Sequence, residues 1–425
     1  MSAKPPPVAQ RRPYRHSYHG VDLDDPYFWL QDPGYPQVED TDVLAYLDEE
    51  NAYFESWYEP HQGLTQTLFE ELKGRKPEQD ESVPYEKNGY RYQWRFNAGD
   101  QYRVWLRQSA TDDSEQWSTL LNENTLAEGC EYFRLGALAV SPDGTMLAFS
   151  TDTNGSERFT LKVIEIASGE VLTTAIENCA GSVIWNADSH GFAYRLVNEN
   201  WRPDKALYRE LTSGEDTLLY QEKDDSFFVG LGLSQSEQLM FISSGDHVTS
   251  EVRFVPRDNL RAEQTLIATR REGHEYDVEH QGDDAKTGRL IIRSNRNHPN
   301  FDLFETPVAT PEEVHWQILL PGDESHYLMG HVAFADALIV CLRINGLDQV
   351  QIVDNSGSHL IEFPEPAYSV DLGTNPNYRT NALRLAYTSM VTPHTVFDYH
   401  WQTKSLTRLK VQEIPGGYEA SDFVS

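Results

Sequence analysis

A tight turn followed by alternating apolar residues is the clearest pattern in this chain, and residues 139–152, AVSPDGTMLAFSTD, show it best. The letters SPDG supply turn chemistry, because proline fixes φ, aspartate can bond its own backbone and glycine accepts a positive φ. In the strand that follows, Leu147 and Phe149 would point to one side while Met146 and Ala148 point to the other. The stretch therefore predicts a β-turn that leads into a strand.

The same unit recurs along the chain as a turn of Asn, Asp, Ser or Gly before an apolar run. The further copies lie at residues 88–92, 186–194, 234–241, 287–292, 335–340 and 379–387. Their spacing of roughly 43 to 55 residues leaves room for about four short strands, as in a propeller blade. Seven units predict an all-β, seven-bladed β-propeller over residues 83–409. A two-sheet sandwich, or several small β domains with a coincidental period, is the alternative.

The residues before the repeats have helical periodicity instead. Apolar residues recur at three- and four-residue steps over residues 41–57 and again over 63–73, which predicts two helices in an arm of residues 17–75. Residues 1–16 are rich in proline and arginine and are predicted to be disordered. The polar residues 76–82 are predicted to be a hinge linker, and residues 410–425 a connector.

Charge and hydropathy restrict the classes of partner. The formal net charge is −32, and phosphate neutralisation needs Lys and Arg, so nucleic acid and anionic membrane are not expected as partners. No apolar run approaches the ~20 residues of a membrane span, and the N-terminus has no apolar signal core, so we expect a cytoplasmic protein. The acidity is either a solvated surface or a cavity that concentrates cationic peptides.

No cofactor and no metal site are expected from the sequence. Cys130, Cys179 and Cys341 are widely spaced and lack the grouping that binds zinc, so reduced thiols are predicted. Histidines and carboxylates crowd residues 271–280, which could suggest metal ligands. A strand is the favoured interpretation, because it would place His274 and His280 on one face and the carboxylates on the other.

Several segments in chain order resemble oligopeptidase B of the prolyl oligopeptidase family. These are DPYFWL at residues 25–30, EN at 50–51, PYEKNGYRY at 84–92, EKDD at 222–225, TSEV at 249–252, HEY at 274–276, RSN at 293–295, NF at 300–301, SMVTP at 389–393 and KVQEIPG at 410–416. The resemblance implies an N-terminal arm, a seven-bladed propeller and a C-terminal α/β-hydrolase domain. That domain carries a Ser-Asp-His triad that cleaves short peptides after Lys or Arg.

The sequence departs from the family pattern in that it ends where the hydrolase domain is expected. A nucleophile elbow needs G-x-S-x-G, because the glycines permit the strained turn that exposes the serine hydroxyl, and this pattern does not occur here. No catalytic residue is therefore assigned. Family residues that bind the basic side chain of the substrate would also lie in the hydrolase domain.

The resemblance gives this region the role of a gate that filters short basic oligopeptides before they reach a hydrolase domain, in the same chain or a separate one. Candidate substrate-channel or domain-interface residues are Glu157, Arg158, Glu222, Asp224 and Asp225. Candidate hinge residues are Arg75, Lys76, Pro77, Pro415, Gly416 and Gly417. The chain alone is expected to be inactive. Two alternatives stay open: one half of a split peptidase, or a non-catalytic propeller that serves as a scaffold or binding module.

Overall fold

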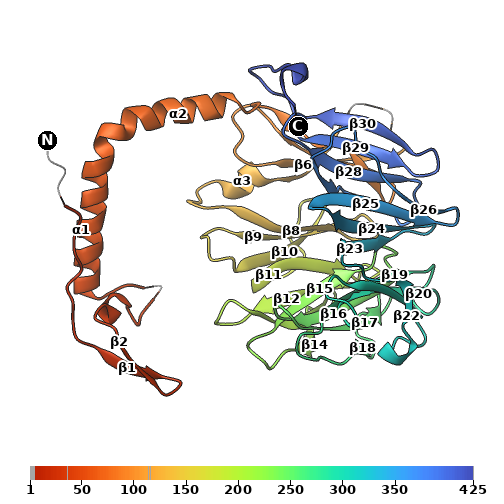
Figure 1. Ribbon diagram of the computed structural model, residues 1–425, viewed down its shortest axis with the longest axis horizontal. Helices are drawn as coiled ribbons and strands as arrows, with labels where there is room; N and C mark the ends of the chain where they lie inside the picture. Colours follow the sequence, from red (N-terminus) through yellow and green to blue (C-terminus); the bar gives the residue numbers. More distant parts are fainter. Residues whose placement is uncertain (1–4, 36, 113, 115, 425) are drawn as a thin grey trace. The chain divides into compact units, whose positions relative to one another are not determined.

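The structure is a computed structural model that describes residues 5–35, 37–112, 114 and 116–424. Two compact units make up the chain. The first comprises residues 1–77 and 413–417, and the second comprises residues 78–412 and 418–425. Each unit is described by itself below (Figure 1). In the described part of the chain, no helix combines the length and apolar character needed to cross a membrane.

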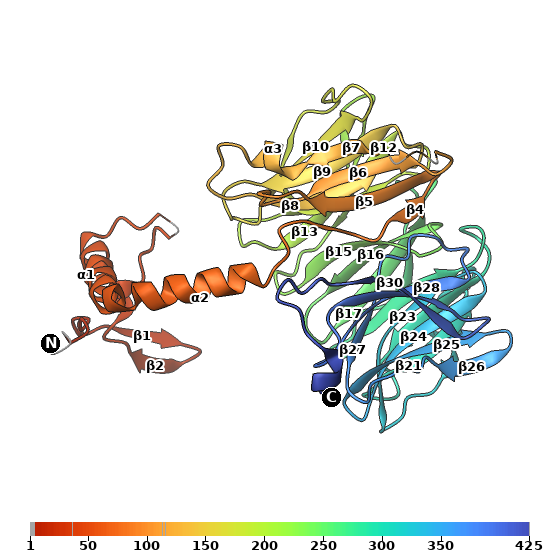
Figure 2. The same ribbon diagram turned by 90° about the horizontal axis from the view of Figure 1, so that it is seen from above.

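The first unit contains a short β-hairpin and two helices. Its elements are β1 (Arg15–Tyr18), β2 (Val21–Asp24), the 3-10 helix η1 (Phe28–Leu30), α1 (Thr41–Tyr58), η2 (Glu59–His61) and α2 (Gln62–Gly74). The hairpin and both long helices are seen in Figure 2. The two helices predicted from apolar periodicity are thus confirmed. The sequence predicted disorder up to residue 16, whereas β1 already begins at Arg15 and residues 1–4 lie outside the described part.

Helix α1 begins with a side-chain cap, and both helices of the first unit leave most of their apolar residues exposed. Asp40 precedes α1, and its carboxylate accepts hydrogen bonds from the backbone N–H groups of Asp42 and Val43, which satisfies donors that the first turn leaves free. Val43 is the one described residue of the two helices that is buried. Apolar side chains are exposed at Leu44, Leu47, Phe54, Trp57, Leu64, Leu68, Phe69 and Leu72.

The second unit consists of antiparallel sheets. The first sheet contains β3 (Asp80–Glu81), β4 (Tyr85–Lys87), β5 (Tyr90–Phe96), β6 (Val104–Ser109) and β7 (Ser118–Asn122), followed by α3 (Glu123–Ala127). The next contains β8 (Arg134–Val140), β9 (Met146–Asp152), β10 (Phe159–Glu165), β11 (Ile176–Trp185), β12 (Gly191–Val197), β13 (Pro203–Glu210) and β14 (Asp216–Gln221).

Four four-stranded sheets follow in chain order. They contain β15 (Phe228–Leu233), β16 (Leu239–Gly245), β17 (Ser250–Pro256) and β18 (Thr265–Ala268); β19 (Tyr276–Gln281), β20 (Arg289–Ser294), β21 (Asp302–Pro307) and β22 (Gln317–Leu320); β23 (His326–Ala333), β24 (Ala337–Ile344), β25 (Leu347–Asp354) and β26 (Gly357–Leu360); and β27 (Ser369–Leu372), β28 (Ala382–Thr388), β29 (Thr395–His400) and β30 (Ser405–Val411). The 3-10 helices η3 (Glu313–His315) and η4 (Ala420–Asp422) complete the described elements.

The all-β propeller is confirmed, but the prediction of seven blades is wrong. The described residues form five separate blades of four or five strands and one continuous seven-stranded sheet, β8 to β14. The long strand β11 causes the difference. Its first part pairs with β10 (Phe159 opposite Cys179) and its second part pairs with β12 (Trp185 opposite Phe192), with a register shift between them. One strand thus joins two sets of strands that the turn spacing had counted as separate blades.

The sheets follow one another in chain order around a ring, and the sheet of β27 to β30 returns beside that of β5 and β6 (Figure 1). In the described part no strand is shared between these two sheets. Polar contacts join them: Arg384 Nη1 donates to the Pro84 carbonyl at 2.7 Å, Asn377 Nδ2 donates to the Glu86 carbonyl at 3.0 Å, and Lys410 pairs with Asp80. Elsewhere neighbouring sheets share apolar cores, such as Leu239 and Phe254 with Phe304.

The pairing of β27 to β30 defines two faces of the ring. Val411 lies opposite Thr395 at the same end of the sheet as the turn 389–394, whereas the turn 373–381 lies at the other end. We call the first end the linker face, because residues 78–82 and 412 lie there, and the second end the far face. Contacts between turns join turns of the same face, as for Arg158 with Asn198 within the seven-stranded sheet and for Lys87 with Glu237 between two sheets.

Candidate functional site

Glu157 and Arg158 lie in the turn between β9 and β10 on the linker face. Glu157 has a φ of 58°, and its backbone N–H donates to Asp152 Oδ2 at 2.8 Å. Its carboxylate pairs with Arg134 Nη1 at 2.9 Å, and both side chains are more than half exposed. Exposed pairs of this kind contribute little stability by themselves, since water screens both charges. Glu157 is thus available for further contacts on this face.

Arg158 bonds residues of the neighbouring turn and does not pair with Glu157. Its Nη2 donates to the carbonyl oxygens of Asn198 at 2.7 Å and Glu199 at 3.2 Å, and its guanidinium lies 4.7 Å from the centre of the Trp201 ring. Stacking and hydrogen bonding together fix the 198–202 turn against the 153–158 turn. Arg158 therefore has a structural role on the linker face, where it holds the two turns together. Trp201, on which it stacks, is exposed on that face.

Glu222 stands at the centre of a compact ion-pair cluster after β14. Its carboxylate accepts from Arg270 Nη2 at 2.5 Å, from Ser244 Oγ and from Tyr220 Oη at 3.0 Å. Arg270 also lies 3.8 Å above the Phe227 ring. Because Glu222 is only 7% exposed, its charge is compensated inside the protein and not presented to a cationic peptide.

The environment of Glu222 shifts its acidity strongly. Burial would raise the pKa of this carboxyl, but hydrogen bonds from Arg270, Ser244 and the backbone N–H groups of Asp224 and Lys223 outweigh burial and lower the pKa to about 2. Asp224 and Asp225 follow it and are exposed. Asp224 Oδ1 accepts from the Ser226 N–H at 2.9 Å, and no contact of the Asp225 side chain is recorded in the described residues. Of the three candidate carboxylates in residues 222–225, these two face solvent.

The predicted hinge residues belong to the first unit. Arg75 follows α2 and pairs with Glu71, and the Lys76 N–H donates to the Lys73 carbonyl at 3.1 Å. Pro77 is the last residue of the segment before the second unit begins. In the C-terminal segment, which contains Pro415 and Gly416, the Gly417 N–H closes a turn onto the Ile414 carbonyl at 2.8 Å, with a φ of 69° at Gly417 that favours glycine.

Exposed apolar side chains occur in several turns of the linker face. Trp201, Val248 and Met390 lie in three different turns and are 48%, 50% and 87% exposed, and Phe228 beside them is also exposed. Single exposed apolar side chains are common on protein surfaces, and these three lie on one face of the ring. Sequence reasoning did not single out Val248 and Met390, because a lone apolar residue in a turn has no periodic pattern.

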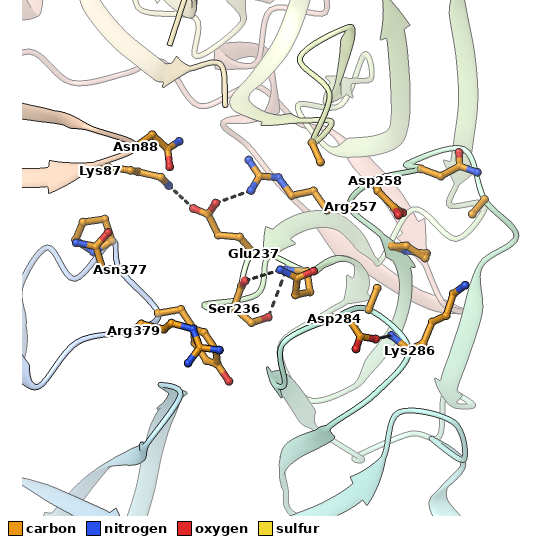
Figure 3. Close-up of a pocket in the computed structure, with 18 residues that line it drawn as sticks. Lys87, Asn88, Ser236, Glu237, Arg257, Asp258, Asp284, Lys286, Asn377 and Arg379 are labelled. Carbon is orange, nitrogen blue, oxygen red and sulfur yellow. Dashed lines mark hydrogen bonds and ion pairs between the residues drawn. The ribbon is translucent and has the colours of Figure 1, made fainter. Parts of the chain in front are cut away.

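The far face carries a cavity of about 990 Å³ (Figure 3). Turns of five sheets line it. Its charged side chains are those of Lys87, Glu237, Arg257, Asp258, Asp284, Lys286 and Arg379. Glu237 pairs with Lys87 and with Arg257 Nη1, the latter at 2.5 Å. Burial would raise the pKa of Glu237, but these two cations lower it. Their shared carboxylate thus ties the first sheet, which contains Lys87, to the sheet of β15 to β18.

A buried Ser–His pair lies beside this cavity. Ser236 Oγ is 2.7 Å from His280 Nδ1, and His280 Nε2 is 3.1 Å from the Thr287 carbonyl. Ser236 is 5% exposed and also receives the Gln238 N–H at 3.3 Å, while burial lowers the pKa of His280. These bonds fix the 234–238 turn. Among the residues that the structure describes, no acidic side chain hydrogen-bonds the histidine ring as in a catalytic triad.

Residues 271–280 enter a strand, as the sequence favoured. β19 begins at Tyr276, and Tyr276 and His280 are both buried. His274 bonds Ser294 at 2.9 Å and not another histidine. Within the residues that the structure describes, no three His, Cys, Asp or Glu side chains are grouped as metal ligands.

The sequence profile of the family described as "Prolyl oligopeptidase, N-terminal beta-propeller domain" matches residues 6–412. Dipeptidyl aminopeptidase BI of Pseudoxanthomonas mexicana is 31% identical over 447 aligned positions, which cover 100% of this chain and 60% of that protein. Protease 2 of Moraxella lacunata is 31% identical, with 98% and 60% covered. This chain thus spans about 60% of the length of these relatives.

Solved structures agree in fold. Oligopeptidase B from Leishmania major superposes with a TM-score of 0.90 at 24% identity, covering 99% of this chain and 62% of that one. Oligopeptidase B from Trypanosoma brucei, in a closed form with covalently bound antipain, superposes with a TM-score of 0.89 at 25% identity and covers 98% and 62%. The profile match spans far more than half of the sequence, and therefore this chain belongs to the prolyl oligopeptidase family through its N-terminal β-propeller domain.

Proposed function

We propose that these residues form the N-terminal gating region of an oligopeptidase B-like serine peptidase that cleaves short peptides after Lys or Arg in the cytoplasm. The propeller filters substrates, and a C-terminal α/β-hydrolase domain supplies the Ser-Asp-His triad. Because the sequence contains no G-x-S-x-G, the 425 residues alone do not hydrolyse peptides.

The observation that carries this proposal is the agreement, along almost the whole chain, with proteins named as peptidases. The 31% identity to Protease 2 extends over 98% of the chain, and the Trypanosoma brucei oligopeptidase B superposes over the same share. A shared fold alone does not imply a shared function, whereas sequence identity along the whole chain supports it.

The linker face has properties that suit a covering hydrolase domain. The exposed apolar residues Trp201, Val248 and Met390 would become buried against it. Glu157 would meet that domain at the rim, while Arg158 and Glu222 hold the turns in place. The propeller and the hydrolase domain would open and close by movement at two hinges. These hinges are residues Arg75, Lys76 and Pro77 and residues Pro415, Gly416 and Gly417.

The exposed carboxylates Asp224 and Asp225 would attract short cationic peptides toward this face. The overall charge of −32 acts in the same sense, since long-range attraction raises the rate of encounter with basic substrates. This attraction is screened by salt, because the Debye length falls from about 10 Å at 0.1 M to about 3 Å at 1 M ionic strength.

The test is a cleavage assay on the protein immunopurified from its own cells with an antibody against the propeller. Fluorogenic peptides with Lys or Arg before the reporter should be cleaved, and matched peptides with Ala or Glu at that position should not. The recombinant 425-residue chain is the control and should be inert. Absence of cleavage after Lys and Arg in the immunopurified protein would refute the proposed activity.

A further inference from the structure

The loop between β27 and β28, residues 373–381, lies on the far face and has an unusual set of contacts. It contains the sequence GTNPNYRTN, which is polar apart from Pro376 and Tyr378. The Tyr378 carbonyl accepts the backbone N–H of Ala335 at 3.1 Å, so the loop is hydrogen-bonded to the neighbouring sheet, β23 to β26. This contact is expected between adjacent blades, because their turns lie side by side.

Other contacts of the loop reach sheets that are not its neighbours. Gln235 Nε2, in the turn between β15 and β16, donates to the Asn375 carbonyl at 2.7 Å. In a ring, a turn of the last sheet can meet a turn of the β15 to β18 sheet only by crossing the middle. Arg379 additionally pairs with Asp283, in the turn between β19 and β20. The loop therefore extends across the axis of the ring.

The loop also reaches the first sheet, which is the neighbour of its own sheet on the other side. Asn377 Nδ2 donates to the Glu86 carbonyl at 3.0 Å. Residues 376–379 line the far-face cavity, and Asn377 and Arg379 are labelled among its lining residues in Figure 3. One segment of nine residues thus contacts four other sheets.

The shape of the loop is fixed from within. The Asn375 side chain accepts the Arg384 N–H at 2.7 Å and donates to the carbonyl oxygens of Gly373 at 2.9 Å and Arg384 at 3.0 Å. A Cβ at Gly373 would lie 2.9 Å from the Arg384 side chain, so glycine is needed there. Pro376 restricts the backbone further. These hydrogen bonds and backbone restrictions hold the loop in one conformation.

Tyr378 is half-buried at the base of the loop. Burial raises the pKa of its hydroxyl, which lies near the Gly282 backbone and the Glu279 carboxyl. Anchoring in a second, non-adjacent sheet is what a closing element requires, because contact with the neighbouring sheet alone would leave the loop free to swing away from the axis.

We propose that residues 373–381 are a plug that closes the propeller axis at the far face, so that peptides can enter the complete enzyme only from the linker face and cannot thread through the ring. The closed axis is a property of this chain alone. The limit on peptide length rests on the proposed function, because it needs an attached catalytic domain.

Seating of the plug can be measured by native-state hydrogen exchange, because the Ala335 N–H is protected by the Tyr378 carbonyl. The variant Gln235→Ala/Asn377→Ala removes the cross-axis bond and the bond to Glu86 while leaving both backbones intact. Loss of two such hydrogen bonds should speed exchange of the Ala335 amide and of the loop amides by about fivefold to a hundredfold, with global unfolding unchanged. If the double variant fails to fold, Asn377→Ala alone is used, with a smaller increase expected.

The matched control is Arg379→Ala, in the same loop. Its ion pair with Asp283 is 68% and 70% exposed and should contribute little, so exchange at Ala335 should change less than twofold. Unchanged exchange in the Gln235→Ala/Asn377→Ala variant, or equal acceleration in the control, would overturn the plug.

The second measurement uses the immunopurified or equivalent full-length enzyme and a series of Lys-containing peptides of increasing length. The Gln235→Ala/Asn377→Ala variant should cleave the shortest peptide with an unchanged kcat/KM. It should also cleave longer peptides that the wild-type enzyme does not cleave. Faster exchange with an unchanged length limit would refute the role in specificity. If wild-type enzyme cleaves none of the peptides, the proposed function fails, whereas the exchange result still decides whether the plug exists.

Discussion

Two buried carboxyl groups, Glu222 and Glu279, are shifted in opposite directions by their surroundings. Glu222 has a guanidinium, two hydroxyl groups and two backbone N–H groups around it, and its pKa falls to about 2. Glu279 has the backbone N–H groups of His280 and Gln235 but no cation, and burial raises its pKa to about 7. The difference follows from the presence or absence of one positive partner, which the sequence around either glutamate does not reveal.

Removing the partner of Glu222 should be costly. In Arg270→Ala the carboxylate stays buried without its guanidinium, so we expect a loss of about 2 to 3 kcal/mol in the free energy of unfolding, measured with urea. The exposed pair of Arg379 provides the comparison, because Arg379→Ala should cost at most about 0.5 kcal/mol. Equal losses in the two variants would show that the cluster at Glu222 contributes nothing particular.

Glu279 should make stability depend on pH near neutrality. Its pKa is higher in the folded chain, about 7, than the ordinary 4.5, so the folded state retains a proton that the unfolded state releases. Stability from this group is present below pH 4.5 and is lost as the pH rises to 7. Glu279→Gln keeps the acceptor oxygen and should remove this decline. The variant should therefore exceed the wild type in stability at pH 8 by more than at pH 5, and an equal difference at both pH values would contradict the assignment.

At the scale of elements, the periodicity of apolar residues was enough to predict the two helices and to predict that the repeats form strands. The apolar spacing over residues 41–57 and 63–73 predicted α1 and α2 closely, since a helix repeats its own face locally. The blade count failed at β11, whose ten residues pair with β10 and then with β12. Which neighbours a strand pairs with is a long-range property, and turn spacing does not contain it.

Gly191, at the start of β12, tests the packing of the seven-stranded sheet. A Cβ there would collide with the Tyr208 side chain and with the Arg209 carbonyl, and the backbone oxygen cannot move aside easily. Gly191→Ala should therefore destabilise the chain by about 2 kcal/mol. Gly232 in β15 has open space around it, so Gly232→Ala should be close to neutral in the same denaturation experiment. A neutral Gly191→Ala would mean that β12 and β13 pack less closely than described.

At the scale of the whole molecule, the sequence predicted the family and the kind of fold but only part of the candidate site. The segments that resemble oligopeptidase B are local strings, and these can be recognised one by one. The negative charge of Glu222 is neutralised by Arg270, which lies 48 positions away in the sequence. The far-face cavity and the loop 373–381 arise from turns of several sheets that only the closed ring brings together. These features could not be predicted from any local pattern.

The most direct test of the central proposal is the intact mass of the protein isolated from its own cells with an antibody against the propeller. The account predicts a mass larger than 48.6 kDa by that of a hydrolase domain, because the propeller would gate a triad on the same chain. A mass of 48.6 kDa with no hydrolase chain bound would contradict it and would favour a non-catalytic binding role.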